Sequence, residues 1–150
     1  MLGRKSPCRA FPMHADPTEI AAKSSYPCVI KPLLLNGSRV VIRDKNPMEF
    51  ETAWKRISAI LRKSVGTRIL VEDYIPGKEF AVEALLGEGG LRVLAIFDKP
   101  APLEGPFFEE TIYVTPSRMN ANEQDKILTA TREAARALGL HFGPVHAELR

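Results

Sequence analysis

Residues 79–97, EFAVEALLGEGGLRVLAIF, decide the class of this fold. In the first half, apolar residues alternate with Glu79 and Glu83, which is typical of a strand with one buried face. The glycine-rich stretch 87–90 then turns the chain, and the apolar run 91–97 returns as the second strand of an antiparallel hairpin. Because a hairpin is not part of regular β-α-β winding, we expect an α+β fold with mixed or antiparallel sheets and flanking helices.

A long amphipathic helix is predicted before this hairpin, over residues 47–63. Asn46 can cap it, Pro47 suits its first position, and Glu49 completes a capping box with Asn46. Steps of three and four residues separate the members of one apolar face, which consists of Phe50, Ala53, Trp54, Ile57, Ile60 and Leu61.

A second helix is predicted after the hairpin, over residues 121–138. Asn120 and Glu123 frame its start, and Gly139 ends it. Its expected apolar stripe consists of Ile127, Thr131, Ala134, Ala135 and Leu138. Shorter elements are a helix at 18–23 and strands at 28–31, 68–75, 111–115 and 145–149. Residues 1–12 are predicted to be either an incoming strand or a loose terminus.

The composition is that of one globular domain. The chain has 150 residues, of which 45% are hydrophobic and 26% charged, and this excludes a disordered or fibrous chain. No apolar stretch approaches the roughly 20 residues that cross a bilayer, and no signal-peptide pattern follows Arg4 and Lys5, so we expect a cytoplasmic protein without membrane contact. Cys8 and Cys28 are interpreted as two unpaired thiols.

Two basic features lie near the predicted strand 28–31. Lys31 stands at the strand end, directly before Pro32, where a rigid backbone suits a fixed phosphate contact. The turn 36–39, Asn-Gly-Ser-Arg, offers backbone N–H groups that can surround phosphate oxygens. The alternative is an ordinary solvated lysine followed by an ordinary hairpin turn.

Two acids flank the turn that follows the strand 68–75. Glu72 closes that strand and Glu79 opens the next one, seven residues later across a Pro-Gly turn. A carboxylate beside an apolar slot can accept hydrogen bonds from an adenine amine or from ribose hydroxyls. The alternative is a pair of surface acids at a strand boundary.

Further acids lie near the C-terminus. Alternation in the strand 145–149 places His146, Glu148 and Arg150 on one face, and a carboxylate on a rigid strand is a good Mg²⁺ ligand. Ordinary polarity of an edge strand is the alternative. Glu109 and Glu110 are adjacent in a loop, where they are either a solubilising pair or contacts for a substrate amine or a second metal.

Together, these segments resemble the ATP-grasp superfamily, most closely its carboxylate–amine ligases. The resemblance rests on the order and spacing of PCVIKP at 27–32, NGSR at 36–39, VEDYIPGKE at 71–79 and GPVHAE at 143–148, and it covers about residues 8–150. It implies ATP and Mg²⁺ as cofactors, with Mn²⁺ as an alternative metal. It also implies that ATP activates a small carboxylate as an acyl phosphate, which an amine or a thiol then attacks.

The resemblance also implies roles for individual residues. Lys31 is similar to the lysine that binds the ATP phosphates, and Gly37 and Ser38 resemble the loop that closes over them. Glu72 with the backbone of Asp73, Tyr74 and Ile75 resembles the adenine-recognition segment. Glu79 is similar to the ribose-binding glutamate, and Glu148 to the first of the acids that bind Mg²⁺. We assign no catalytic residue, and we expect Lys31, Glu72, Glu79 and Glu148 to line one crevice.

The sequence departs from the family pattern in two respects. Val40 stands where related loops place a glycine, and the strand with the remaining metal ligands would follow Arg150. The resemblance therefore implies the central portion of a longer ligase. Residues 1–25 enter from an N-terminal domain, 26–78 form the smaller lobe with the phosphate loop, 74–78 hinge the lobes, and 79–150 form the larger lobe.

Three further expectations concern function and association. A catalytically inactive nucleotide-binding or interaction module with the same fold is the main alternative to a ligase. An open sheet edge would favour association with another chain. A basic domain that binds RNA or DNA is a third alternative, but nucleic acid is not expected because no run of Lys and Arg interleaved with aromatic residues occurs.

Overall fold

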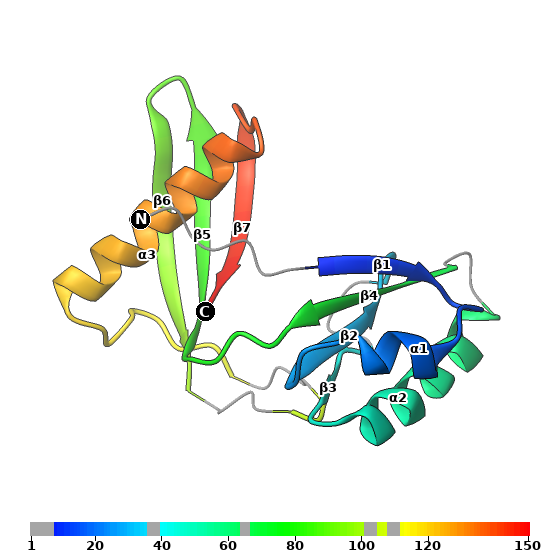
Figure 1. Cartoon of the computed structure of the whole chain (residues 1–150). Coiled ribbons are helices and arrows are strands. Elements are labelled where there is room, and N and C mark those ends of the chain that lie inside the picture. The colour runs from blue at the N-terminus through cyan, green and yellow to red at the C-terminus, as the bar shows by residue number, and fades with distance from the viewer. Residues whose placement is uncertain (1–7, 36–39, 64–66, 101–104, 108–111) are drawn as a thin grey trace. The chain divides into compact units, whose positions relative to one another are not determined.

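The computed structural model describes residues 8–35, 40–63, 67–100, 105–107 and 112–150 (Figure 1). The described residues form two compact units. The first contains residues 8–35, 40–63, 67–75 and 105–107, and the second contains residues 76–100 and 112–150. The boundary therefore falls between Ile75 and Pro76. Each unit is described below by itself.

The first unit is a four-stranded antiparallel sheet with two helices. Its strand order is β1-β4-β2-β3, where β1 is Cys8–Pro12, β2 is Cys28–Pro32, β3 is Ile42–Asp44 and β4 is Arg68–Asp73. The helices α1 (Pro17–Ala22) and α2 (Pro47–Leu61) contribute to the same core, and Figure 1 shows both on one side of this sheet. Of the two alternatives for the N-terminal segment, the strand is correct, because β1 pairs with β4.

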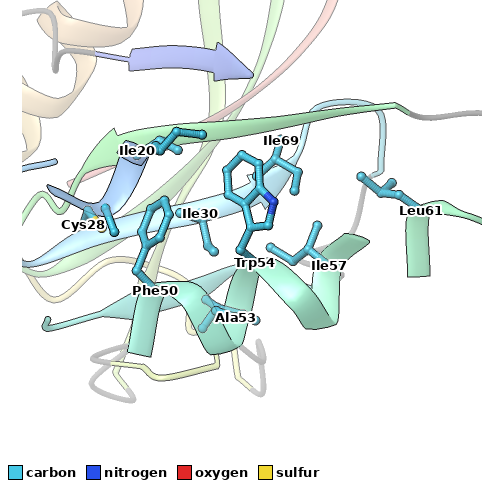
Figure 2. Close-up of a cluster of buried hydrophobic side chains, with 12 residues drawn as sticks. Ile20, Cys28, Ile30, Phe50, Ala53, Trp54, Ile57, Leu61 and Ile69 are labelled. Atoms are coloured by element: carbon cyan, nitrogen blue, oxygen red, sulfur yellow. The ribbon is translucent and has the colours of Figure 1, made fainter. Parts of the chain in front are cut away.

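The core of this unit is built around α2. Phe50, Trp54 and Ile57 are at most 2% exposed, and the Trp54 ring stacks on the Phe50 ring at 5.7 Å (Figure 2). Both the Trp54 indole and the Ser58 hydroxyl donate hydrogen bonds to the Met13 carbonyl oxygen, at 3.2 and 3.1 Å. The prediction that Ile60 belongs to the apolar face is wrong. It is 37% exposed, because the buried stripe continues through Ser58 to Leu61.

Strand alternation gives the sheet one apolar and one polar face. Cys28 and Ile30 point into the core, as do Ile69 and Val71 of the neighbouring strand. Their sequence neighbours therefore point to the opposite face, which carries Val29, Lys31, Arg43, Leu70 and Glu72. This polar face positions the first group of candidate site residues.

The second unit confirms the predicted hairpin. Its three-stranded antiparallel sheet has the order β6-β5-β7, where β5 is Glu79–Gly87, β6 is Gly90–Lys99 and β7 is Gly143–Leu149. Helix α3 (Ala121–Ala137) packs on one face of this sheet (Figure 1). The core is small: Val82, Ala84 and Ile96 are its buried members, with partly buried residues around them.

Two predictions about the second unit are wrong in detail. Leu138 is 75% exposed, and Ala134 is exposed too, because α3 turns Ile127, Leu128, Thr131 and Ala135 toward the sheet instead. The described part of the predicted strand 111–115 forms only an isolated bridge between Val114 and Asp98. Asp98 also accepts hydrogen bonds from Ser117 and from the Arg118 amide, so the chain turns away there.

The predicted α+β class with antiparallel sheets and flanking helices is confirmed. Of the capping box predicted at the start of α2, the structure shows the first half, in which the Glu49 amide donates to Asn46 Oδ1. Asn120 and Glu123 form a complete capping box at α3, whereas at α2 the Glu49 carboxylate accepts from the Lys45 amide and the Asn46 side chain.

In the described ranges, no helix combines the length and the apolar character that crossing a membrane requires.

Candidate functional site

Lys31 and Glu72 form an ion pair on the polar face of the first unit. They come from the adjacent strands β2 and β4, and 2.6 Å separates the Lys31 Nζ from the Glu72 Oε1. Their side chains are 35% and 26% exposed, so water screens the pair and its contribution to stability is small. The structure thus brings together two residues that belong to separate motifs in the sequence.

Arg43 lies on the same face and was not predicted from the sequence. In β3 it is the register partner of Val29, whose partner on the other side is Glu72. Its guanidinium carbon lies 3.8 Å from the centre of the Tyr74 ring, and its Nε atom is buried. The Tyr74 amide in turn donates a hydrogen bond to the Pro27 carbonyl oxygen at 3.1 Å. β3 itself was not predicted, because the three residues Ile42, Arg43 and Asp44 are too few to show a strand period.

Glu79 and Glu148 meet through Lys99 in the second unit. Lys99 Nζ lies 2.7 Å from Glu79 Oε1 and 2.5 Å from Glu148 Oε1, and its side chain is only 3% exposed. Glu79 also accepts a hydrogen bond from Arg150 Nε at 2.9 Å. Because the Lys99 ammonium is removed from water, it depends on the carboxylates of Glu79 and Glu148 for its electrostatic stabilisation.

Lys99 was missed because of a break in the strand register. From the turn, Gly87 opposes Gly90 and Ala84 opposes Val93, a pairing that would continue to place Asp98 opposite Glu79. The register shifts between Glu83 and Ala84, and Lys99 opposes Glu79 instead. An irregularity of this kind is not encoded in the alternation of apolar and polar residues.

Tyr113 covers this cluster. Its ring centre lies 4.8 Å from Lys99 Nζ, its hydroxyl lies 3.4 Å from Glu148 Oε1, and its ring makes an edge contact with Phe97 at 6.0 Å. A lysine ammonium over an aromatic ring is attracted by the ring electrons. Tyr113 therefore shields one side of the Lys99 ammonium.

The alternation predicted for 145–149 is confirmed. Val145, Ala147 and Leu149 pack against the core, whereas His146, Glu148 and Arg150 contact charged residues on the other face. His146 Nδ1 lies 2.7 Å from Glu83 Oε1, and its Nε2 lies 3.8 Å from Glu148 Oε1. The His146 ring thus lies between the carboxylates of Glu83 and Glu148.

The chemistry of these donors fits a divalent metal only in part. In the described part of the chain, no group of three or more His, Cys, Asp or Glu side chains is arranged to hold a metal ion. Mg²⁺ normally takes one or two carboxylates and completes its shell with phosphate oxygens and water. Glu148 is thus one suitable ligand, and the metal site stays a prediction.

Four predicted site residues lie outside the described residues: Gly37, Ser38, Glu109 and Glu110. The residue after the predicted phosphate loop is described. Val40 has a backbone φ of 62°, in the left-handed region that a β-branched residue rarely adopts. Glycine adopts this conformation without strain, which explains physically why a glycine suits this position.

One buried acid lies on the core side of the first unit, away from the polar face. Asp44 is 1% exposed, and its Oδ2 has no hydrogen-bond partner among the described residues. Burial, with a smaller contribution from Glu49, raises the pKa of Asp44 to about 7. Its register partner Cys28 is buried as well, and burial raises the pKa of that thiol to about 12.

A family model for the ATP-grasp domain matches residues 24–150. The chain belongs to the ATP-grasp family. Among solved structures, an L-amino acid ligase from Bacillus licheniformis is 33% identical with a TM-score of 0.82, and the match covers 98% of this chain and 35% of the ligase. The resemblance inferred from the four motifs is therefore confirmed for the family and for its fold.

Two curated relatives are also similar to this ATP-grasp chain. Carnosine synthase 1 from Gallus gallus is 34% identical over 85 residues, which cover 57% of this chain and 9% of the synthase. Alanine--anticapsin ligase from Bacillus amyloliquefaciens is 24% identical over 143 residues, which cover 83% of this chain and 30% of the ligase. The chain thus spans less than a third of the length of these curated relatives.

Proposed function

We propose that this ATP-grasp chain is the ATP-binding part of a ligase that joins a small carboxylate to an amine, or to a thiol, through an acyl phosphate. The observation that carries the proposal is that residues chosen from separate motifs meet in pairs. Lys31 contacts Glu72 directly, and Glu79 contacts Glu148 through Lys99. The names of the relatives, two ligases and a synthase, support the same class of reaction.

In the proposed complex, the first unit binds the base and the phosphates. The half-exposed Lys31–Glu72 pair has little stability to lose, so the Lys31 ammonium can turn toward phosphate oxygens at low cost. Glu72 and the backbone from Asp73 to Ile75 would then meet the adenine edge, because a carboxylate and backbone groups can satisfy its donors and acceptors.

The second unit binds the ribose and the metal in this proposal. Glu79 accepts hydrogen bonds from the ribose hydroxyls, and Glu148 is one metal ligand. In a nucleotide the phosphate chain joins the ribose to the metal. Lys99 lies between Glu79 and Glu148, so its ammonium holds the two carboxylates in one cluster.

Charge neutralisation and positioning are what the chain contributes to phosphoryl transfer. Lys31 holds the phosphates in this proposal, whereas Lys99 holds Glu79 and Glu148 together and Tyr113 keeps water from one side of it. Mg²⁺ or Mn²⁺, when bound, would supply further neutralisation of the transferred phosphoryl group. The loop residues Glu109 and Glu110 stay candidates for holding the substrate amine.

An inactive nucleotide-binding or interaction module is the second candidate, and one observation favours it. Val40, which follows the predicted phosphate loop, is held at a φ of 62° where the family pattern has glycine, so this position itself carries backbone strain. Release of ADP in the presence of a panel of amino acids would distinguish the candidates. Turnover by the 150-residue chain would exclude the inactive module.

Calorimetric titration of the folded chain with Mg-ATP tests the proposal. We expect saturable binding by the wild type and loss of that binding in Lys31→Ala, because the phosphates lose their ammonium partner. The matched control is Lys55→Ala, which removes an exposed lysine from α2 and should bind like the wild type. Heats equal to dilution for the wild type would contradict the proposal, as would equal affinities for the wild type and Lys31→Ala.

A further inference from the structure

Arg43 stacks on the side chain of Tyr74, which belongs to the proposed base-recognition segment 73–75. Its guanidinium carbon lies 3.8 Å from the centre of the Tyr74 ring, which is close contact for a cation stacked on an aromatic face. The two residues come from different strands, since Arg43 belongs to β3 and Tyr74 follows the end of β4. β3 and β4 are not neighbours in the sheet, so this contact crosses β2.

Tyr74 is therefore fixed at two points. Its side chain lies under Arg43, and its amide donates to the Pro27 carbonyl oxygen at 3.1 Å. Such double fixing restricts the backbone between Asp73 and Ile75, where the strand has already ended. A segment outside the sheet lacks the ladder of hydrogen bonds that holds a strand, so contacts of this kind decide its shape.

Arg43 is also a poor candidate for a purely electrostatic role. It shares the polar face with the Lys31–Glu72 ion pair, but its Nε is buried and its planar group lies against an aromatic ring. Arginine suits stacking, because its guanidinium is planar and more weakly hydrated than an ammonium. The geometry points to support of Tyr74 rather than to a direct phosphate contact.

We propose that Arg43 is a positioning residue for base selection: by stacking on Tyr74 it keeps the Asp73–Ile75 backbone in the conformation that favours adenine over guanine. This inference rests on the proposed nucleotide-binding function. The two bases present opposite donor and acceptor patterns where adenine has its amine and guanine its carbonyl oxygen. A backbone segment therefore distinguishes them only if its own groups are held in place.

The test compares the dissociation constants of ATP and GTP, both with Mg²⁺, because the two nucleotides share the same triphosphate. We expect the wild type to prefer ATP and Arg43→Met to reduce that preference about tenfold. Arg43→Lys should restore part of the preference, since it returns a cation over the ring. Arg62→Met, which removes an exposed arginine at the end of α2, is the matched control and should keep the wild-type preference.

A double-mutant cycle with Tyr74 separates positioning from general stability. Tyr74→Phe keeps the ring and should keep the preference, whereas Tyr74→Ala should lose it as Arg43→Met does. The double variant Arg43→Met/Tyr74→Ala should lose no more than either single variant. A structural role alone would weaken ATP and GTP equally.

The outcomes distinguish this inference from the proposed function. Wild-type binding of ATP with an unchanged ATP-to-GTP preference in Arg43→Met would overturn the inference and leave the function standing. A wild type that binds both nucleotides equally would overturn it as well. A wild type that binds neither nucleotide would overturn the proposed function and this inference with it.

Discussion

In the first unit, the charged residues of the candidate site lie on the sheet face opposite to the hydrophobic core. In the second unit, they form ion pairs that connect neighbouring strands of the sheet. The first core contains Phe50, Trp54, Ile57 and several other buried side chains, and the Lys31–Glu72 pair is screened by water. The second core has few buried members, and Lys99 is almost completely buried between two carboxylates. Site residues of the first unit should therefore be replaceable without unfolding, and those of the second should not.

The largest expected effect is on the first core. Phe50 is fully buried and stacks on Trp54, so Phe50→Ala leaves a cavity and should lower the free energy of unfolding by about 4 kcal/mol. Hydrogen exchange of the amides in β2 and β4 measures this loss. Met48→Ala, at a position 75% exposed on the same helix, is the control and should change stability by less than about 0.5 kcal/mol. Equal effects of the two substitutions would show that Phe50 does not belong to a stabilising core.

The next effect concerns the buried Lys99 of the second unit, compared with the partly exposed Lys31 of the first. Lys99→Met leaves Glu79 with Arg150 alone and Glu148 without its lysine partner, and it should destabilise the second unit by about 2 kcal/mol. Lys31→Met, by contrast, should cost less than about 1 kcal/mol, because its pair with Glu72 is screened by water. Denaturant unfolding monitored separately in β5 and β2 measures both values. Similar losses for the two variants would contradict the difference drawn between the units.

A pH dependence is expected from Asp44 in the first unit. Its pKa is raised to about 7 in the folded chain from an ordinary value of 3.8, so the folded state binds the proton more tightly than the unfolded state. The stability that this proton provides is complete below pH 4 and is lost as the pH rises toward 7. Between pH 5 and 7 the loss should be on the order of 2 kcal/mol.

Asp44→Asn should remove this slope, because an amide does not titrate. Thermal unfolding at pH 5, 6 and 7 gives the comparison, with Asp16→Asn as a control at an exposed helix cap. A wild-type stability that does not fall between pH 5 and 7, or a slope that persists in Asp44→Asn, would show that Asp44 ionises without penalty in the folded chain.

The smallest effect concerns Val40. Val40→Gly and Val40→Ala both remove the branched side chain, but only glycine adopts a φ of 62° without strain. The glycine variant should therefore be more stable than the alanine variant by about 1 kcal/mol, although glycine normally costs more chain entropy. Chemical denaturation of the two variants side by side measures the difference. A more stable alanine variant would place Val40 in an ordinary conformation.

Most of the secondary structure was predictable because it depends on local signals. Asn46 and Asn120 cap their helices, Gly139 ends α3 with a φ of 68°, and alternation places His146 and Glu148 on one face. The order of four motifs was enough to indicate the family that the comparisons establish. These features are encoded within a few residues of where they act.

Features that depend on non-local pairing were not predictable. β3 has three residues, too few for a period, so Arg43 could not be assigned to the polar face. Lys99 reaches Glu79 only because the strand register shifts along the hairpin. Exposure of Ile60 and Leu138 depends on what covers each helix, which the periodicity of one helix does not specify. That Lys31, Glu72, Glu79 and Glu148 line one crevice stays a prediction.

Backbone amide NMR spectra recorded during titration with Mg-ATP test the central claim most directly, because they report on both groups of site residues in one experiment. We expect chemical-shift changes at the ends of β2 and β4, around Lys31 and Glu72, and also around Glu79, Lys99 and Glu148, all with one dissociation constant. Changes confined to one unit, changes elsewhere on the chain, or no changes at millimolar nucleotide would contradict the claim that both groups bind one nucleotide.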